Sequence, residues 1–186
     1  MNDIQILQEM LKPDVQVALQ SGQRRLSAKL TDSQSNTTVE VKGLPHDSIV
    51  IKADCFKGPF AVFKKGLNIR KRADFVIVSN DERGNKWIIC IETKGGNKTR
   101  AKIAAQLKGA KCFISYCKCI GKSFWESEEF LDGYEYRFVG ITDLNFNRNR
   151  RQTQPFDPAG ELHNRPNIFK KLPQRSTVHF SKLIHP

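Results

Sequence analysis

The chain has 186 residues, 39% hydrophobic and 27% charged, so it is long enough for one domain with a full core. No apolar run approaches the length that crosses a bilayer, and the N-terminus lacks a signal-peptide pattern. We therefore expect a cytoplasmic protein with no membrane partner. The five cysteines are odd in number, which favours free thiols of a reducing compartment over a disulfide framework.

The positive charge is concentrated in two segments. Lys and Arg number 31 against 19 Asp and Glu, a net charge of +12. Residues 45–100 hold twelve basic and six acidic groups, and residues 145–186 hold eight and two, whereas the remaining segments are balanced. This pattern favours a polyanionic partner, and nucleic acid is the natural one. Generic solubility is the alternative explanation.

The first half of the chain predicts a helix pair or a broken helix, followed by strands. Apolar residues at helical spacing indicate the helix over residues 2–20, and the polar stretch 21–36 is predicted to form turns. A loose connection with basic clusters occupies residues 54–72. Runs rich in β-branched residues predict strands at 37–42, 48–53, 74–78 and 87–91.

In the second half, Thr99 is expected to cap a helix from about Arg100 to Lys108, closed by Gly109. Strands are predicted at 112–117 and 134–141. The order of these elements predicts an α/β fold with a mixed central sheet flanked by helices, which we assign to residues 1–144. Residues 145–186 contain five prolines and no long periodic run, so we expect an irregular basic extension.

Two carboxylates and a lysine stand at the ends of neighbouring predicted strands. Asp74 opens one strand, and Glu92-Thr93-Lys94 closes the next, so pairing of the two brings these residues together. Such a cluster is costly unless a cation and an anionic substrate share its charge. We expect Asp74, Glu92 and the carbonyl of Thr93 to bind Mg²⁺ or Mn²⁺, and Lys94 to contact a scissile phosphate or orient water. The alternative is a cross-strand salt bridge on a solvated edge.

Asp74, the Glu92-Thr93-Lys94 tripeptide and a following helix that carries Gln106 resemble the PD-(D/E)XK nuclease superfamily. The resemblance implies a restriction-endonuclease-like core and Mg²⁺-dependent cleavage of nucleic acid, most often DNA. It implies that Asp74 and Glu92 are metal ligands, that Lys94 is the catalytic lysine and that Gln106 lies beside the site.

The sequence departs from the superfamily pattern at Ala73, where a proline often precedes the first aspartate. Some members also use an acidic residue on an N-terminal helix, and Glu9 is the candidate for that role in this chain.

A second copy of the tripeptide, Glu40-Val41-Lys42, also ends a predicted strand. No aspartate opens a preceding strand for this copy, because Asp32 lies in a stretch predicted to form turns. The other copy has Asp74 upstream, Gly95-Gly96 directly after it and a helix beyond. We therefore assign the site to Glu92 and not to Glu40.

The sequence thus predicts a metal-dependent endonuclease, acting as a homodimer or as a subunit of a larger defence, repair or mobile-element complex. The alternatives are a non-catalytic nucleic-acid-binding module on the same fold and an enzyme acting on RNA or a small molecule. The residues predicted to contact nucleic acid are Lys64, Lys65, Arg70, Lys71, Arg72, Lys98, Arg100, Lys102, Arg148, Arg150 and Arg151.

Overall fold

The computed structural model describes residues 1–22, 25–32, 37–56, 62–64, 66–94, 99–142 and 162–186. For Thr37 and Lys94 it describes the backbone alone. Five of the residues predicted to contact nucleic acid lie outside the described part of the chain, namely Lys65, Lys98, Arg148, Arg150 and Arg151.

The structure contains two sheets and one long helix. The helices are α1 (Asp3–Met10), α2 (Arg100–Phe124) and α3 (Ser181–Ile184), with short 3₁₀ turns η1 (Pro13–Val15) and η2 (Ala53–Cys55). The strands are β1 (Leu19–Ser21), β2 (Leu26–Asp32), β3 (Thr37–Leu44), β4 (Asp47–Lys52), β5 (Phe75–Asn80), β6 (Lys86–Lys94), β7 (Glu135–Thr142), β8 (Lys170–Pro173) and β9 (Thr177–His179). The predicted α/β class with a mixed sheet is confirmed.

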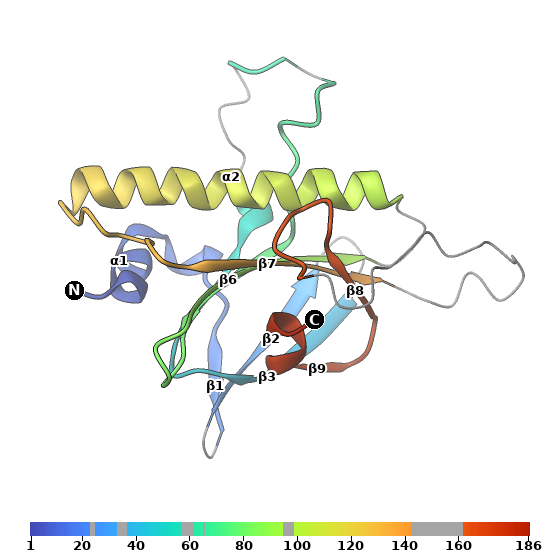
Figure 1. Cartoon of the computed structure of the whole chain (residues 1–186), viewed down its shortest axis with the longest axis horizontal. Coiled ribbons are helices and arrows are strands. Elements are labelled where there is room, and N and C mark those ends of the chain that lie inside the picture. The colour runs from blue at the N-terminus through green and yellow to red at the C-terminus, as the bar shows by residue number, and fades with distance from the viewer. Residues whose placement is uncertain (23–24, 33–36, 57–61, 65, 95–98, 143–161) are drawn as a thin grey trace, which may run out of the picture.

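The elements form three layers. The central sheet has five strands in the order β4-β5-β6-β7-β8, and the second sheet has four in the order β1-β2-β3-β9. Figure 1 shows α2 lying across one face of the central sheet, with the second sheet on the opposite face. Strands β4, β5 and β6 run antiparallel, whereas β7 and β8 run parallel to β6.

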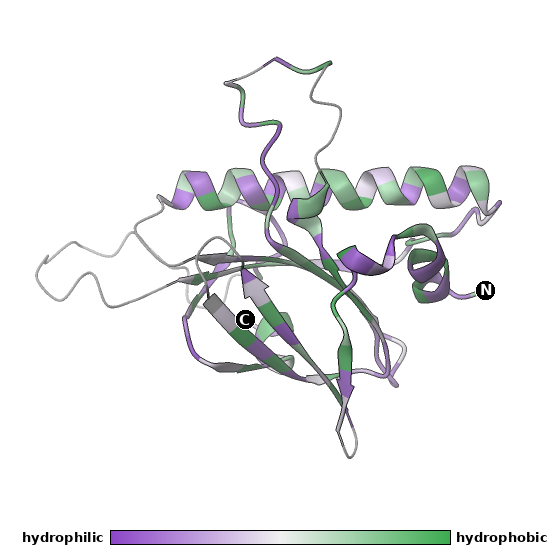
Figure 2. Ribbon diagram, turned by 180° about the vertical axis from the view of Figure 1, so that it is seen from behind, coloured by the Kyte–Doolittle hydropathy of each residue, from purple (hydrophilic) through white to green (hydrophobic). Residues whose placement is uncertain are grey.

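Both faces of the central sheet are buried. Val76 and Ile88 belong to the core beneath the helices, whereas Ile77 and Ile89 belong to the core shared with the second sheet. Strands covered on both faces have continuous apolar sequences, such as Phe75 to Val78 in β5, whereas Figure 2 shows hydrophobic and hydrophilic colours alternating along α2. The five strands predicted between residues 37 and 53, 74 and 91, and 134 and 141 are accordingly confirmed, with bounds shifted by a few residues.

The predicted helix over 100–108 and strand over 112–117 are a single helix, α2, so the strand prediction was wrong. Buried residues recur every three or four positions along the helix, from Ile103 to Gly121. Gly109 does not close the helix. A Cβ atom there would lie 2.7 Å from the carbonyl carbon of Lys71, so glycine allows α2 to cross the segment before β5 at close range.

Three further predictions were wrong. The helical stretch predicted over 2–20 contains α1 and η1, but its last two residues belong to β1. The stretch 21–36 was predicted to form turns, but its described part contains the end of β1 and all of β2, whose Ala28 and Leu30 are buried. Residues 145–186 were predicted to be irregular, but residues 162–186 form β8, β9 and α3. These strands have three or four residues each, which is too short for a visible alternation in the sequence. The boundary at residue 144 stays a prediction.

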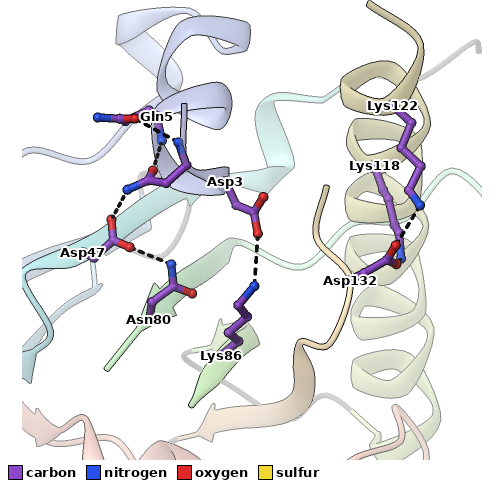
Figure 3. Close-up of polar contacts among 9 residues, drawn as sticks. Asp3, Gln5, Asp47, Asn80, Lys86, Lys118, Lys122 and Asp132 are labelled. Carbon is purple, nitrogen blue, oxygen red and sulfur yellow. Dashed lines mark hydrogen bonds and ion pairs between the residues drawn. The ribbon is translucent and has the colours of Figure 1, made fainter. Parts of the chain in front are cut away.

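Ordinary polar pairs fix the end of β5 and β6 that lies beside α1 (Figure 3). The Asp47 carboxylate accepts hydrogen bonds from Asn80 Nδ2 at 2.6 Å and from Asn2 Nδ2 at 3.4 Å. The Asp3 carboxylate pairs with Lys86 at 3.8 Å. Figure 3 also shows Asp132 paired with Lys118 and Lys122 of α2. Within the described residues, no helix has the length and apolar character needed to cross a membrane.

Candidate functional site

Asp74 lies at the opposite end of β5 and β6, directly before β5, and is 6% exposed. Its Oδ2 atom accepts hydrogen bonds from the backbone N–H of Thr93 at 2.7 Å and from Thr93 Oγ1 at 2.8 Å. The carbonyl of Asp74 accepts a third bond from the N–H of Ala53 at 2.9 Å. The Asp74 carboxylate is therefore held across the strand pair, against the end of β6.

Glu92 is the neighbour of Thr93 in β6 and is fully buried. Alternation along β6 places it on the face of Ile88 and Cys90, which pack in the core beneath α2. Its register partner on β7 is Gly140, and an added Cβ there would approach the Phe169 ring at 2.9 Å. The register of β5 with β6 pairs Phe75 with Ile91, so Asp74 and Glu92 are adjacent across the two strands. The structure thus brings together the two carboxylates that the sequence singled out.

Thr93 has a role that the sequence did not reveal. We expected its carbonyl to bind metal, whereas the structure shows that its N–H and hydroxyl hold the Asp74 carboxylate. Hydrogen bonds to an ionised carboxylate are stronger than those between neutral groups. Thr93 is fully buried, so these bonds are shielded from water and fix the orientation of Asp74.

Helix α2 clamps the segment that leads into Asp74. Gln106 Nε2 donates a hydrogen bond of 3.4 Å to the carbonyl of Arg72, two residues before Asp74. Gly109, one turn further along α2, packs against the carbonyl of Lys71. Gln106 therefore lies next to the segment that carries Asp74, and the bond shown is to the backbone. Sequence reasoning missed Gly109 because it interpreted this glycine as a helix end.

Arg72 contributes to the same clamp. Its Nη1 donates to the carbonyls of Ile69 at 2.9 Å and Lys71 at 2.6 Å, and its guanidinium lies 5.2 Å from the centre of the Phe56 ring. Burial lowers the pKa of the Arg72 guanidinium below its usual value. An arginine remains protonated in spite of such a shift, so Arg72 holds a positive charge against the Phe56 ring and the carbonyl of Lys71.

Lys94 is the last residue of β6, and its backbone is paired with Thr142 of β7. Its side chain lies outside the described structure, so its catalytic role stays a prediction. Glu9 lies elsewhere, because its Oε2 accepts a hydrogen bond of 3.1 Å from Trp125 Nε1. Trp125 follows the last residue of α2, whereas Gln106 lies in the first half of that helix. Figure 1 shows α1 beneath the C-terminal half of α2.

The described basic residues around the site differ in their surroundings. Lys64 and Lys102 are exposed, whereas Arg70 and Lys71 are half-buried. Arg100 packs over the Phe169 ring at 4.7 Å and donates to the carbonyl of Asn167 at 3.3 Å. Arg100 thus joins the first turn of α2 to the C-terminal segment.

The second tripeptide copy lies on the surface. Lys42 and Glu40 form an ion pair of 3.3 Å, with side chains 50% and 25% exposed. An exposed pair of this kind contributes little to stability and has the form of the salt-bridge alternative. Glu92, by contrast, is fully buried, so the two copies of the tripeptide lie in different surroundings.

No group of three or more His, Cys, Asp or Glu residues with the arrangement of a metal site occurs in the part of the chain that the structure describes. Asp74 and Glu92 supply two carboxylates. Comparison of the chain with protein-family models, with curated proteins and with solved structures gave no match.

Proposed function

We propose that this protein is a metal-dependent endonuclease that hydrolyses phosphodiester bonds of DNA by a PD-(D/E)XK-type mechanism. The observation that carries the proposal is the Asp74 carboxylate, hydrogen-bonded to Thr93 beside the buried Glu92 at one end of the central sheet. Two carboxylates from adjacent strands are a suitable donor set for a hard divalent cation, which binds oxygen ligands.

In this proposal Asp74 and Glu92 hold Mg²⁺ or Mn²⁺, with the Thr93 carbonyl as a further ligand. The bound ion neutralises charge on the scissile phosphate and lowers the pKa of a water molecule. Thr93 keeps Asp74 oriented, so its N–H and hydroxyl act by positioning. Lys94 contacts the phosphate or orients the water, and Gln106 keeps the segment before Asp74 against α2.

The topology supports a restriction-endonuclease-like core within the same proposal. When the second-sheet strands β1, β2 and β3 and the 3₁₀ turns are left aside, the chain runs from α1 through β4, β5 and β6 to α2 and β7. Three antiparallel strands are thus followed by a helical crossover to a parallel one. That arrangement agrees with the core that the resemblance implies. The basic excess in residues 45–100 supports a nucleic-acid substrate, because the same segment carries Asp74 and Glu92.

The experiment compares the two tripeptide copies. Purified protein is incubated with supercoiled, linear and single-stranded DNA and with RNA, in the presence of Mg²⁺, Mn²⁺ or a chelator. Glu92→Gln and Lys94→Ala are tested beside Glu40→Gln and Lys42→Ala. We expect metal-dependent nicking that falls at least about a hundredfold in the first pair and stays unchanged in the second.

Undiminished cleavage by both Glu92→Gln and Lys94→Ala would show that the site assignment is wrong. Salt-sensitive binding without cleavage under any condition would instead support the non-catalytic module. Thermal unfolding of each variant shows whether a loss of activity follows from loss of the fold.

A further inference from the structure

An arm with an apolar tip precedes the site. We define the arm as residues 62–64 and 66–72, which in Figure 1 extend past α2 on the side away from the central sheet. Its exposed apolar side chains are Val62 (77%), Phe63 (49%), Leu67 (65%) and Ile69 (45%). These are half of the large exposed hydrophobic residues in the described structure. Apolar side chains that gather in this way, rather than singly, indicate a surface that contacts a partner.

The foot of the arm is fixed to the body of the protein. Arg72 bonds the carbonyl of Ile69, and the N–H of Lys71 donates to the carbonyl of Asn68 at 3.1 Å. Gln106 and Gly109 of α2 hold the last two residues of the arm, as described above. The arm is therefore anchored at the end that leads into Asp74, while its apolar side chains face solvent.

The tip turns through two residues with left-handed backbone conformations. Gly66 has φ of 94° and Asn68 has φ of 59°, which glycine and asparagine adopt more readily than other residues. Leu67 lies between these two residues and therefore belongs to the turn, and Ile69 follows it directly in sequence.

The charge of the arm indicates which kind of partner it binds. Between residues 62 and 73 the sequence contains five basic residues and no acidic one. A polyanion with an apolar interior fits both features, and duplex DNA has phosphates outside and stacked bases within. Proteins that kink DNA insert phenylalanine, leucine or isoleucine between base steps, whereas single-strand platforms need several aromatic residues. The arm has one aromatic residue and three aliphatic ones, so it resembles a wedge more than a stacking platform.

We propose that the arm inserts its apolar tip between base pairs of duplex DNA, with its basic residues on the adjacent phosphates. This inference rests on the proposed nuclease function and names how the substrate is held. Only Ala73 separates the arm from Asp74 in sequence, so the foot of the arm leads into the proposed site. The apolar side chains of the arm contact the duplex on the side of α2 that faces away from the central sheet.

The test measures binding without cleavage. Fluorescence anisotropy of a labelled duplex is followed in chelator for the wild type, for Phe63→Ser/Leu67→Ser and for Phe124→Ser. Phe124 is the matched control, because it is 79% exposed at the far end of α2. We expect at least about tenfold weaker binding by the arm variant and less than about twofold change in the control. A 2-aminopurine base in the duplex should brighten on binding to the wild type, and this signal should be lost with the arm variant.

Three results would overturn the inference. The first is unchanged duplex affinity and 2-aminopurine signal in the arm variant. The second is binding of the wild type to phosphatidylserine vesicles that the arm variant loses while its DNA affinity is unchanged, which would indicate a membrane surface. The third is a wild-type dimer that the arm variant converts to monomers while its DNA affinity is unchanged, which would indicate contact between two copies.

The same variants separate this inference from the proposed function. An arm variant that binds and cuts like the wild type contradicts the arm alone and leaves the site at Asp74 and Glu92 intact. If instead the arm variant loses duplex binding while Glu92→Gln and Lys94→Ala cut normally, the site assignment is wrong and the arm remains supported.

Discussion

Replacing Gly109 with alanine tests how closely α2 crosses the segment before Asp74. In an ordinary helix interior, glycine to alanine stabilises a protein by about 0.5–1 kcal/mol. At Gly109 the new Cβ would lie 2.7 Å from the Lys71 carbonyl carbon and 3.1 Å from Arg72 Nη1. Real Cβ contacts under 3.0 Å essentially never occur, and the obstructing atoms belong to the backbone, so either α2 or the segment must move.

The sign of the change in the free energy of unfolding therefore distinguishes an ordinary helix interior from a close crossing of two segments. Overpacking costs about 1–3 kcal/mol, and contact with a rigid carbonyl belongs in the upper part of that range. After subtraction of the helix preference, we expect a net loss of about 1–2 kcal/mol in the free energy of unfolding. For a chain of this size the loss corresponds to a Tm lower by about 2–8 °C.

The assay is thermal unfolding followed by circular dichroism, with Lys108→Ala as the control. Lys108 is the exposed neighbour of Gly109 on the same helix, so its substitution should change the free energy of unfolding by less than about 0.5 kcal/mol. A Gly109→Ala protein with a higher Tm than the wild type would refute the close crossing. It would also remove the physical reason for the clamp at Lys71 and Arg72.

Two further predictions concern buried titratable groups. Burial lowers the pKa of His163, and nearby Lys170 and Arg137 act in the same direction. The Nε2 atom of His163 lies 2.7 Å from the carbonyl oxygen of Leu183, so the neutral ring donates a hydrogen bond from Nε2. Because the folded-state pKa of His163 lies below the ordinary value of 6.5, the stability contributed by the neutral ring is fully present above pH 6.5. It is lost as pH falls through the folded-state pKa. His163→Gln should flatten the acid side of a plot of Tm against pH, and an unchanged slope would contradict this. Burial raises the pKa of Cys90, and it raises that of Cys117 to about 12. Iodoacetamide should therefore label the exposed Cys55, Cys112 and Cys119 in the native protein, and all five cysteines in denaturant. Labelling of Cys117 in the native protein with protection of Cys112 would contradict the helical placement of these residues.

The sequence was sufficient for the strands that carry the site. Residues 75–78 and 87–91 are continuous apolar runs because both faces of the central sheet are covered, and such runs are easily recognised. Since Asp74 precedes one run and Glu92 follows the other, antiparallel pairing alone places the two carboxylates together. The prediction that these residues converge therefore needed no tertiary information.

The sequence was insufficient where a distant residue decides the local structure. At Gly109 and Gly121, Lys71 and Phe130 occupy the space that a side chain would fill, so glycine serves close packing there and does not end the helix. The sequence of the helix itself carries no pattern from which those contacts could be predicted. The same limit explains why Thr93 was assigned only a carbonyl, since its bonds to Asp74 depend on how the end of β6 meets the start of β5.

The short edge strands were missed for a different reason. β8 and β9 have four and three residues, and their pairing with β7 and β3 supplies the order that their own sequences do not. Val178 of β9 is buried, and so is Phe169, which directly precedes β8 and lies against Gly140 and Arg100. Prolines at 166 and 173 had favoured an irregular tail, although Pro173 is the last residue of an edge strand, a position that tolerates proline.

Direct measurement of Mn²⁺ binding tests the central claim without knowledge of the substrate. The titration is followed by electron paramagnetic resonance of the free ion, for the wild type, Glu92→Gln and Glu40→Gln. Since Glu92 is proposed as a direct ligand, we predict affinity weakened by at least about tenfold in Glu92→Gln and unchanged in Glu40→Gln. Equal Mn²⁺ affinity of Glu92→Gln and the wild type would contradict the account that Asp74 and Glu92 form a metal site.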